Sequence, residues 1–269
     1  MNKFPELSSF KKHTFRKHAP PSIFHLICKS NSVQEFKQHL QNISQKDREW
    51  VKDFTQHQSK CPFWFIYRQC CITGSIAKRI VSAAEKNKKL PGLDKAISKF
   101  DSDFYTNDAM LWGVNNESQG IDVLWNDFKN QHHQPGLHHA GICMDSDIQF
   151  LSGSPDIILS CINCCNPSGT FYAVGEIKCP WRLRNTGIDD WRNLDYLTEN
   201  FELKKNHSYY FQLTLYCGIL KMSRCYFTIW TPKGHKVLSV AFDEELYNII
   251  KSSAEKYYYN HYLKDFFLD

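Results

Sequence analysis

The sequence predicts a mixed fold of helices and strands, α/β or α+β, from the order of its patterns. The first half shows mainly helical patterns, whereas residues 141–179 and 225–242 show the short apolar runs of strands. A last helical segment, residues 244–263, follows them. Helices that precede and surround a short mixed sheet are typical of this class. We expect a partly irregular N-terminal extension over residues 1–34 and a single domain over residues 35–269.

The composition indicates a folded globular protein with a mildly basic surface. Of 269 residues, 42% are hydrophobic and 14% aromatic, which excludes an intrinsically disordered chain. A chain of this size buries a substantial core without disulfides. The net charge of +5 is compatible with a polyanionic partner. The 11 cysteines, the absence of an apolar leader and the absence of any run near 18 apolar residues predict a reducing intracellular compartment, cytoplasm or nucleus, without membrane contact.

Three helices are expected in the N-terminal part, each with a recognisable start. Ser or Thr followed three residues later by an acidic residue is a capping-box pattern. Apolar residues at helical spacing follow the third start and stop at a Pro-Gly pair. The starts are Ser32 with Glu35, Ser44 with Asp47, and Thr73 to Ser75, the last helix ending at Leu90-Pro91-Gly92.

Glu117 lies in a fourth expected helix, Met110 to Phe128. The apolar residues Val114, Ile121 and Leu124 fall on one face of this helix, and Glu117 falls on the same face. A carboxylate on an apolar face costs free energy unless it has a partner. We therefore expect Glu117 to belong to a site.

The second half is expected to hold the sheet. Apolar runs separated by Pro, Gly and Asn are typical of strands and turns. The expected strands are Gly141 to Met144, Phe150 to Ser160, Thr170 to Cys179, Cys225 to Thr231 and Val237 to Phe242, with a turn at residues 166–169 and a helix from His207 to Met222.

Two short segments bring acidic residues to neighbouring strands. Glu176 and Lys178 are two residues apart on one predicted strand, so their side chains leave the same face. Asp156 begins the adjacent strand, directly after Pro155, and the hairpin places it beside Glu176. The alternative interpretation, an exposed ion pair on an edge strand, fits less well because the pair is embedded in apolar residues.

This set of residues suits a hard cation and phosphodiester hydrolysis. Carboxylate and carbonyl oxygens of Asp156, Glu176, Ile177 and Glu117 are the ligands that Mg²⁺ prefers. A divalent ion polarises the phosphate, and a lysine at the position of Lys178 assists the attacking water or offsets the developing charge.

The order of motifs resembles the lambda-type exonucleases, also called the YqaJ-like viral recombinase family, of the PD-(D/E)XK superfamily. The resemblance covers roughly residues 35–245. It is carried by five blocks in a fixed order, which are far more specific together than singly. The blocks are Arg68 with Ile72-Thr73-Gly74-Ser75, Gly113 with Glu117, Gly153-Ser154-Pro155-Asp156, Glu176-Ile177-Lys178-Cys179-Pro180, and Tyr209-Tyr210-Phe211-Gln212.

The resemblance implies a restriction-endonuclease-like core, a central mixed β-sheet flanked by helices. It also implies cleavage of double-stranded DNA ends from the 5′ side with two Mg²⁺ or Mn²⁺ ions. By this resemblance Asp156 and Glu176 are metal ligands, Lys178 activates water, and Glu117 is a further acid. A homotrimer and a single-strand annealing protein as partner are expected on the same ground.

The resemblance also implies substrate contacts. Arg68 and Ser75, with Thr73 between them, match the residues that hold the terminal 5′-phosphate. A helix N-terminus at Ser75 and a bidentate guanidinium at Arg68 suit a phosphate on physical grounds as well. Gly74 stands where the family has alanine, and we expect little effect.

Three further residues have two interpretations each. Trp181 and Arg182 follow the Glu176 strand and either contact DNA or form a basic loop. Gln212 is either a site residue or helical surface, because the family pattern Gln-x-Gln continues here with Thr214.

Two rival functions stay open, as does a second metal site. A structure-specific or restriction-like endonuclease would use the same core, and a non-catalytic DNA-end-binding recombination module would keep the fold without chemistry. Whether Cys161, Cys164 and Cys165 bind a metal is not decided by their spacing.

Overall fold

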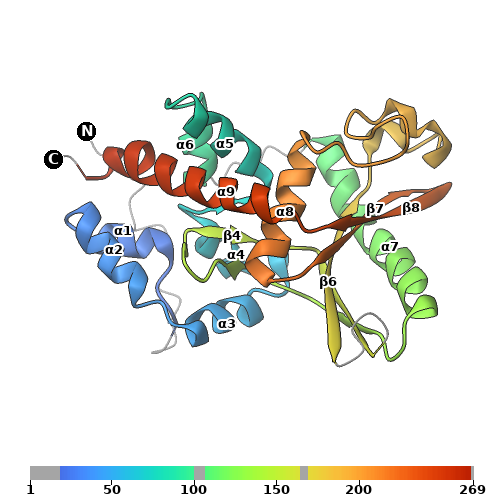
Figure 1. The fold of residues 1–269 in the computed structure, drawn as a ribbon, viewed down its shortest axis with the longest axis horizontal. Helices are drawn as coiled ribbons and strands as arrows, with labels where there is room; N and C mark the ends of the chain where they lie inside the picture. Colours follow the sequence, from blue (N-terminus) through green and yellow to red (C-terminus); the bar gives the residue numbers. More distant parts are fainter. Residues whose placement is uncertain (1–18, 100–106, 164–168, 268–269) are drawn as a thin grey trace.

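The computed structural model describes residues 19–99, 107–163 and 169–267. They form mixed β-sheets with helices around them, as the sequence predicts, but the strands divide into two sheets where one was expected (Figure 1). Within these residues, no helix has both the length and the apolar character needed to cross a membrane.

The N-terminal part is helical, and its caps explain where two of the helices begin. Ser44 and Asp47 form both bonds of a capping box. Ser32 accepts a hydrogen bond from the Glu35 N–H, but the Glu35 carboxylate accepts from Asn31 instead. The helices are α1 (Ile23–Lys29), α2 (Val33–Gln41), α3 (Gln45–Phe54), α4 (Pro62–Arg68), α5 (Ala77–Glu85), α6 (Leu93–Ser98) and α7 (Asp108–Gln131).

Helix α1 lies inside the expected N-terminal extension and was not predicted. Its Ile23, Leu26 and Ile27 are buried in the same core cluster as residues of α2, α5 and α9 (Glu244–Tyr257). A seven-residue helix is marginal by itself, so this packing is what stabilises it. Residues 1–18 of the expected extension lie outside the described residues, and the boundary at residue 34 stays a prediction.

The strands form a three-stranded and a five-stranded sheet. The small sheet has the order β1-β4-β3, with β1 and β4 parallel. The large sheet has the order β2-β5-β6-β7-β8, in which only β6 and β7 are parallel among the described strand pairs. Their bounds are β1 Ile72–Thr73, β2 Gly136–His138, β3 Cys143–Met144, β4 Leu151–Gly153, β5 Ile157–Ile162, β6 Thr170–Lys178, β7 Arg224–Thr231 and β8 Gly234–Ala241.

The single strand predicted over Phe150 to Ser160 is wrong. The chain leaves the small sheet after Gly153 and enters the large sheet at Ile157, so residues 154–156 connect the two sheets. Pro155 has no N–H to donate to a strand ladder, which favours a break there. The Gln58 side chain donates to the Pro155 carbonyl at 2.9 Å and satisfies the freed acceptor.

The large sheet is covered on both faces by helices. Ile177 of β6 is buried with Leu124 and Phe128 of α7. Val174 of the same strand is buried with Leu213 of α8 (Ser208–Leu220). In Figure 1, α7 and α8 lie on opposite sides of β6. The two helices therefore enclose the strand that carries Glu176 and Lys178.

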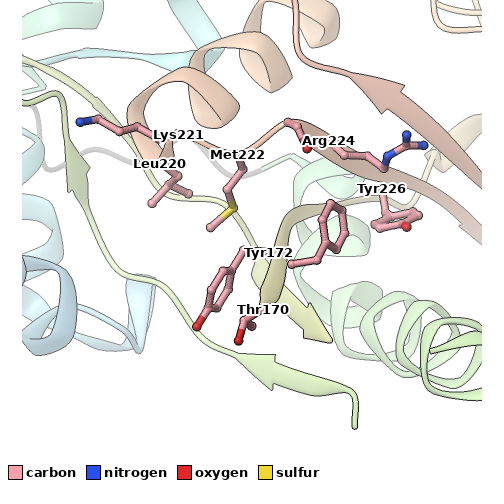
Figure 2. Close-up of a pocket in the computed structure, with 9 residues that line it drawn as sticks. Thr170, Tyr172, Leu220, Lys221, Met222, Arg224 and Tyr226 are labelled. Carbon is pink, nitrogen blue, oxygen red and sulfur yellow. The ribbon is translucent and has the colours of Figure 1, made fainter. Parts of the chain in front are cut away.

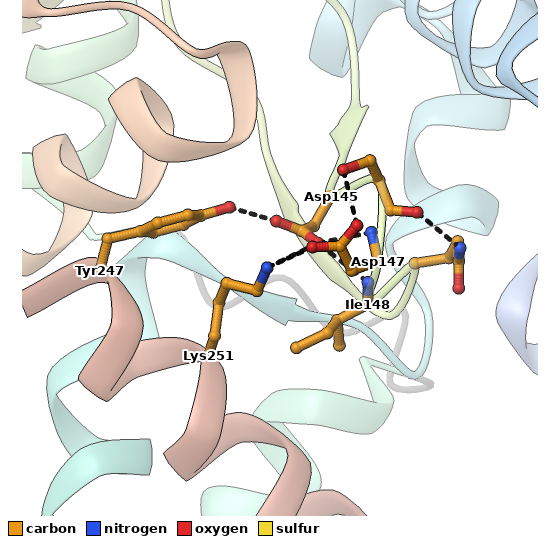
Figure 3. Close-up of polar contacts among 7 residues, drawn as sticks. Asp145, Asp147, Ile148, Tyr247 and Lys251 are labelled. Atoms are coloured by element: carbon orange, nitrogen blue, oxygen red, sulfur yellow. Dashed lines mark hydrogen bonds and ion pairs between the residues drawn. The ribbon is translucent and has the colours of Figure 1, made fainter. Parts of the chain in front are cut away.

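A buried polar network fixes α9 to the turn between β3 and β4. Asp145 is 1% exposed and accepts hydrogen bonds from the N–H groups of Asp147 and Ile148 and from the Tyr247 hydroxyl. Lys251 forms an ion pair with Asp147 at 2.5 Å (Figure 3). The network satisfies a buried carboxylate and holds the small sheet against the C-terminal helix.

Candidate functional site

The register of β5 and β6 brings Asp156 next to Glu176, as the sequence predicts. Ile157 pairs with Gly175 in an antiparallel ladder, so the preceding Asp156 stands opposite Glu176. The Asp156 carboxylate accepts a hydrogen bond from the Ile177 N–H at 2.7 Å. This bond extends the ladder by one residue and orients the carboxylate toward β6.

Glu176 is almost completely buried, with 2% of its surface exposed. One carboxylate oxygen, Oε1, accepts hydrogen bonds from Lys178 Nζ at 2.6 Å and from Gln212 Nε2 at 2.9 Å. The other oxygen, Oε2, is buried and has no hydrogen-bond partner. A buried carboxylate oxygen without a donor is unfavourable, so this atom requires a ligand that the protein itself does not supply.

Glu117 approaches the same site from α7. It is half-buried, whereas Val114 on the expected apolar face is 68% exposed, so that face is buried only from Gly120 onward. A Cβ atom at Gly120 would lie 2.2 Å from Ile177, so only glycine lets α7 approach β6 this closely. Burial and the negative charge of Glu176 raise the pKa of Glu117.

The charges of the site are unbalanced. Burial and the negative charge of Glu176 raise the pKa of Asp156 well above its usual range, and Lys178 only partly opposes this. Burial disfavours the charged form of Lys178, but Glu176 and Asp156 outweigh it and raise its pKa. Lys178 is therefore firmly protonated in this state. Three carboxylates share one lysine, which leaves excess negative charge for a cation to offset.

The donor set fits a divalent cation, although it is not assembled around one. Among the described residues, no three His, Cys, Asp or Glu side chains lie close enough together to form a metal site as they stand. The unpartnered Glu176 Oε2 and the mutual repulsion of Asp156, Glu176 and Glu117 are the features that fit Mg²⁺ or Mn²⁺.

The expected phosphate-binding residues lie on α4 and on the turn into α5. Arg68 ends α4, and its guanidinium lies 3.8 Å from the centre of the Trp64 ring. Thr73 is buried, and its hydroxyl lies 3.4 Å from that of Ser75. Ser75 is exposed in the 3-10 turn Gly74–Ile76 that leads into α5, close to a helix N-terminus as predicted.

Helix α8 links these residues to the acidic cluster. Gln212 donates to Glu176 and also to the Tyr216 hydroxyl at 2.8 Å. Gln212 is thus buried in the site, and the interpretation as helical surface is wrong. A Cβ atom at Gly74 would lie 2.9 Å from both Gln212 and Tyr216, so alanine there would require a shift. The expectation that Gly74 matters little is therefore not supported by this contact.

Trp181 and Arg182 differ in how accessible they are. Trp181 lies edge-on to Trp112 and under the Arg184 guanidinium, which is 3.8 Å from its ring centre. Arg182 is exposed. Trp181 is thus already stacked on protein groups, while Arg182 stands open to solvent.

Two residues of the site were given no role from the sequence: Trp64, and Tyr209 of the fifth motif block. Trp64 supports Arg68 from one turn earlier on α4 and donates its indole N–H to Ser154 at 3.0 Å, two residues before Asp156. The ring of Tyr209 lies 5.0 Å from Lys178 Nζ. Trp64 and Arg68 are four residues apart, a spacing that places two side chains on the same face of a helix. This spacing could have predicted their contact.

Two other features lie away from this site. An open cavity of about 800 Å³ lies at the far end of β6, where Thr170 and Tyr172 face Met222 and Arg224 (Figure 2). Glu176 and Lys178 are at the opposite end of that strand. Cys161 is buried in β5, while Cys164 and Cys165 lie outside the described residues, so a metal site at the three cysteines is not tested.

Comparison with known proteins gives structural matches without sequence matches. No protein-family model and no curated protein matches the sequence. The structure is similar to a SOX–DNA complex (TM-score 0.58, 12% identity, 91% of this chain and 78% of the other). It is also similar to LHK-Exo, an alkaline exonuclease from Laribacter hongkongensis, in complex with dAMP (TM-score 0.50, 16% identity, 76% and 96%). The chain shares the mixed α/β fold of these structures.

A third match, to the SOX–RNA complex of Kaposi's sarcoma-associated herpesvirus, has a TM-score of 0.55 at 12% identity and covers 88% of this chain and 79% of the other. The shared fold confirms the predicted fold class and agrees with the family resemblance found in the motifs. At these identities the likeness extends to the fold alone.

Proposed function

We propose that this chain is a metal-dependent deoxyribonuclease that degrades linear duplex DNA from its 5′ ends. The observation that carries the proposal is the cluster of Asp156, Lys178 and the buried Glu176, in which Glu176 Oε2 has no partner. Two further observations support the same conclusion: the cluster lies in a fold shared with exonuclease structures, and the order of the sequence motifs resembles that of the lambda-type exonucleases. That similar structures include exonucleases is a further support.

Asp156, Glu176, Glu117 and the Ile177 carbonyl would hold the divalent ions. When bound, such ions polarise the scissile phosphate and lower the pKa of the attacking water. Lys178 stays protonated beside Glu176 and offsets the negative charge that develops at phosphorus. Gln212 and Lys178 hold Glu176 Oε1, which would leave Oε2 available to coordinate a cation.

End dependence would come from Arg68, Thr73 and Ser75. The guanidinium of Arg68 lies over the Trp64 ring, and Ser75 is exposed beside a helix N-terminus. Fixed donors of this kind suit a phosphate monoester at a strand end. Arg182, open to solvent after β6, would contact the backbone.

The main alternative is an endonuclease on the same core, acting on DNA or RNA. One similar structure was solved with RNA, which is the observation that favours it. A non-catalytic end-binding module is disfavoured, because an intact acid–lysine cluster is expensive to keep buried without chemistry.

The deciding experiment compares four substrates with the purified chain in Mg²⁺, in Mn²⁺ and in chelator. They are linear duplex DNA with 5′-phosphate, the same duplex with 5′-hydroxyl, a covalently closed circle, and a single-stranded RNA. Metal-dependent loss of the 5′-phosphorylated duplex with an intact circle is expected. Cleavage of the circle or the RNA at a similar rate would replace the exonuclease by the endonuclease alternative.

Three features of the proposal follow from the family resemblance. They are the binding of two metal ions, the assembly of a homotrimer that encloses the duplex, and a single-strand annealing protein as partner. Sedimentation of the chain with and without duplex DNA would test the trimer, and a titration of metal by calorimetry would count the ions.

A further inference from the structure

Lys99 is fixed onto the segment that directly follows Arg68, although it comes from a different element. It follows α6 in a left-handed conformation, with φ of 52°. Its Nζ donates a hydrogen bond to the Cys71 carbonyl at 3.0 Å, and the Cys70 N–H donates to the Ser98 carbonyl. Cys71 lies between Arg68 and the Thr73–Ser75 turn in sequence. The end of α6 is therefore docked onto the segment that carries the expected phosphate-binding residues.

Arg68 and Lys99 are two partly buried cations for which the described residues supply no counter-anion. Neither forms an ion pair with another residue in the part of the chain that the structure describes. The groups that face Lys99 are Arg68 from α4 and the thiols of Cys70 and Cys71 from the following segment. Burial and the positive charge of Arg68 lower the pKa of Lys99 to about 7. Two like charges held together in this way are unfavourable until an anion joins them.

We propose that Lys99 is a second cationic contact for the terminal 5′-phosphate, acting with Arg68. The inference rests on the proposed function, because the ligand is the phosphate monoester of a DNA end. Such a group carries close to two negative charges and three acceptor oxygens. The planar guanidinium of Arg68 and the compact ammonium of Lys99 are complementary donors for it. Binding of the dianion draws a proton onto Lys99, so recognition of the end is coupled to proton uptake.

The test measures binding in chelator, so it does not depend on cleavage. A short duplex with 5′-phosphate and the same duplex with 5′-hydroxyl are titrated at pH 8 by calorimetry in two buffers of different ionisation enthalpy. The variants are Lys99→Met, Lys99→Arg and Arg68→Met. Lys88→Met is the matched control, because Lys88 is an exposed lysine of the same region without a side-chain contact in the described structure.

For the wild-type chain and Lys88→Met we expect tighter binding of the phosphorylated duplex and uptake of about one extra proton. Lys99→Met should reduce the preference for the phosphorylated end by about tenfold or more and abolish the extra uptake. Lys99→Arg should keep most of the preference but lose the uptake, because arginine is always protonated.

If Lys99→Met keeps both the preference and the uptake, Lys99 only braces the Cys71 carbonyl and the inference is wrong. A wild-type chain that binds both duplexes equally would overturn the 5′-phosphate pocket and this inference together. Loss of preference in Arg68→Met but not in Lys99→Met would keep the pocket and reject Lys99. Failure of cleavage alone, with the preference intact, would count against the proposed hydrolysis and leave Lys99 assigned.

Discussion

Gln212 of α8 donates its side-chain N–H to Glu176 of β6 across 2.9 Å, in the interior of the molecule. The bond fixes one oxygen of Glu176 and leaves the other to a ligand. The same side-chain nitrogen of Gln212 also donates to the Tyr216 hydroxyl, so both N–H groups of the amide have an acceptor. Glu176 is thereby positioned by a residue on a different element.

Replacement of Gln212 by leucine tests this positioning. Loss of a group that orients a metal ligand typically lowers metal affinity or activity by about 10- to 100-fold. We expect Gln212→Leu to fall in that range, measured as the initial rate on 5′-phosphorylated duplex. Gln119→Leu on the exposed side of α7 is the control and should leave the rate unchanged. Equal rates for both variants would mean that Gln212 has no part in orienting Glu176.

Lys178→Met should remove cleavage while DNA binding persists. A positioned proton donor or cation of this kind contributes about 10²–10⁴ in rate. Binding of duplex is measured by fluorescence anisotropy in Ca²⁺ or chelator. The control is Lys129→Met, an exposed lysine on α7. A Lys178→Met variant that cuts at the wild-type rate contradicts the role assigned to Lys178.

Asp156→Asn should have opposite effects on the metal-free protein and on its response to metal. Without metal, the substitution removes one of three mutually repelling carboxylates, so the melting temperature should rise. Asparagine can still accept from the Ile177 N–H. Wild-type protein should be stabilised by Mg²⁺ or Mn²⁺, by about 2.7 kcal/mol at a hundredfold excess over Kd, and the variant should not. A variant that melts earlier without metal would show that Asp156 is structural.

Tyr247→Phe should destabilise the fold without a specific effect on the site. The substitution removes a donor from the buried Asp145 carboxylate, which costs about 1–3 kcal/mol. Urea denaturation measures the loss. Tyr259→Phe on the same C-terminal segment serves as the control, because no hydrogen bond is recorded for its hydroxyl in the described structure, and should change stability by less. Similar values for both variants would mean that the hydroxyl of Tyr247 contributes nothing.

Lys99 predicts how stability depends on pH. In the unfolded chain Lys99 keeps its proton up to about pH 10.4, whereas in the folded protein it loses it near pH 7. Between these values the unfolded state binds more protons, so the contribution of Lys99 to the free energy of unfolding rises with pH. The free energy of unfolding of the wild type minus that of Lys99→Met should therefore rise from pH 7 to pH 9, as measured by chemical denaturation. A difference that is flat across this range would contradict the lowered pKa.

Much of the site could be predicted because it is local in sequence. The alternation along β6 places Glu176 and Lys178 on one face, and the β5–β6 hairpin brings Asp156 opposite them. The helix starts at Ser32 and Ser44 follow from capping residues in the same way. In these cases the physical rule spans only a few residues, so the pattern in the sequence determines it.

The parts that could not be predicted depend on contacts distant in sequence. Helix α1 exists because its apolar side chains are buried against later elements. The pairing of Trp64 with Ser154 joins residues 90 positions apart, and Lys99 reaches the Cys71 carbonyl only through the docking of α6. Pro155 indicates a break in the strand. The sequence does not show that this break separates two sheets, because the sheet to which a strand belongs depends on its neighbouring strands.

The tripeptide between the two sheets places Asp156 at the junction of both. Thr73 lies on β1, which pairs directly with β4, and β4 runs into Ser154 and Asp156. A DNA terminus held beside β1 would therefore be joined to one of the acids through a single strand and three residues of chain. We expect termini that seat poorly there to be processed slowly even when they bind.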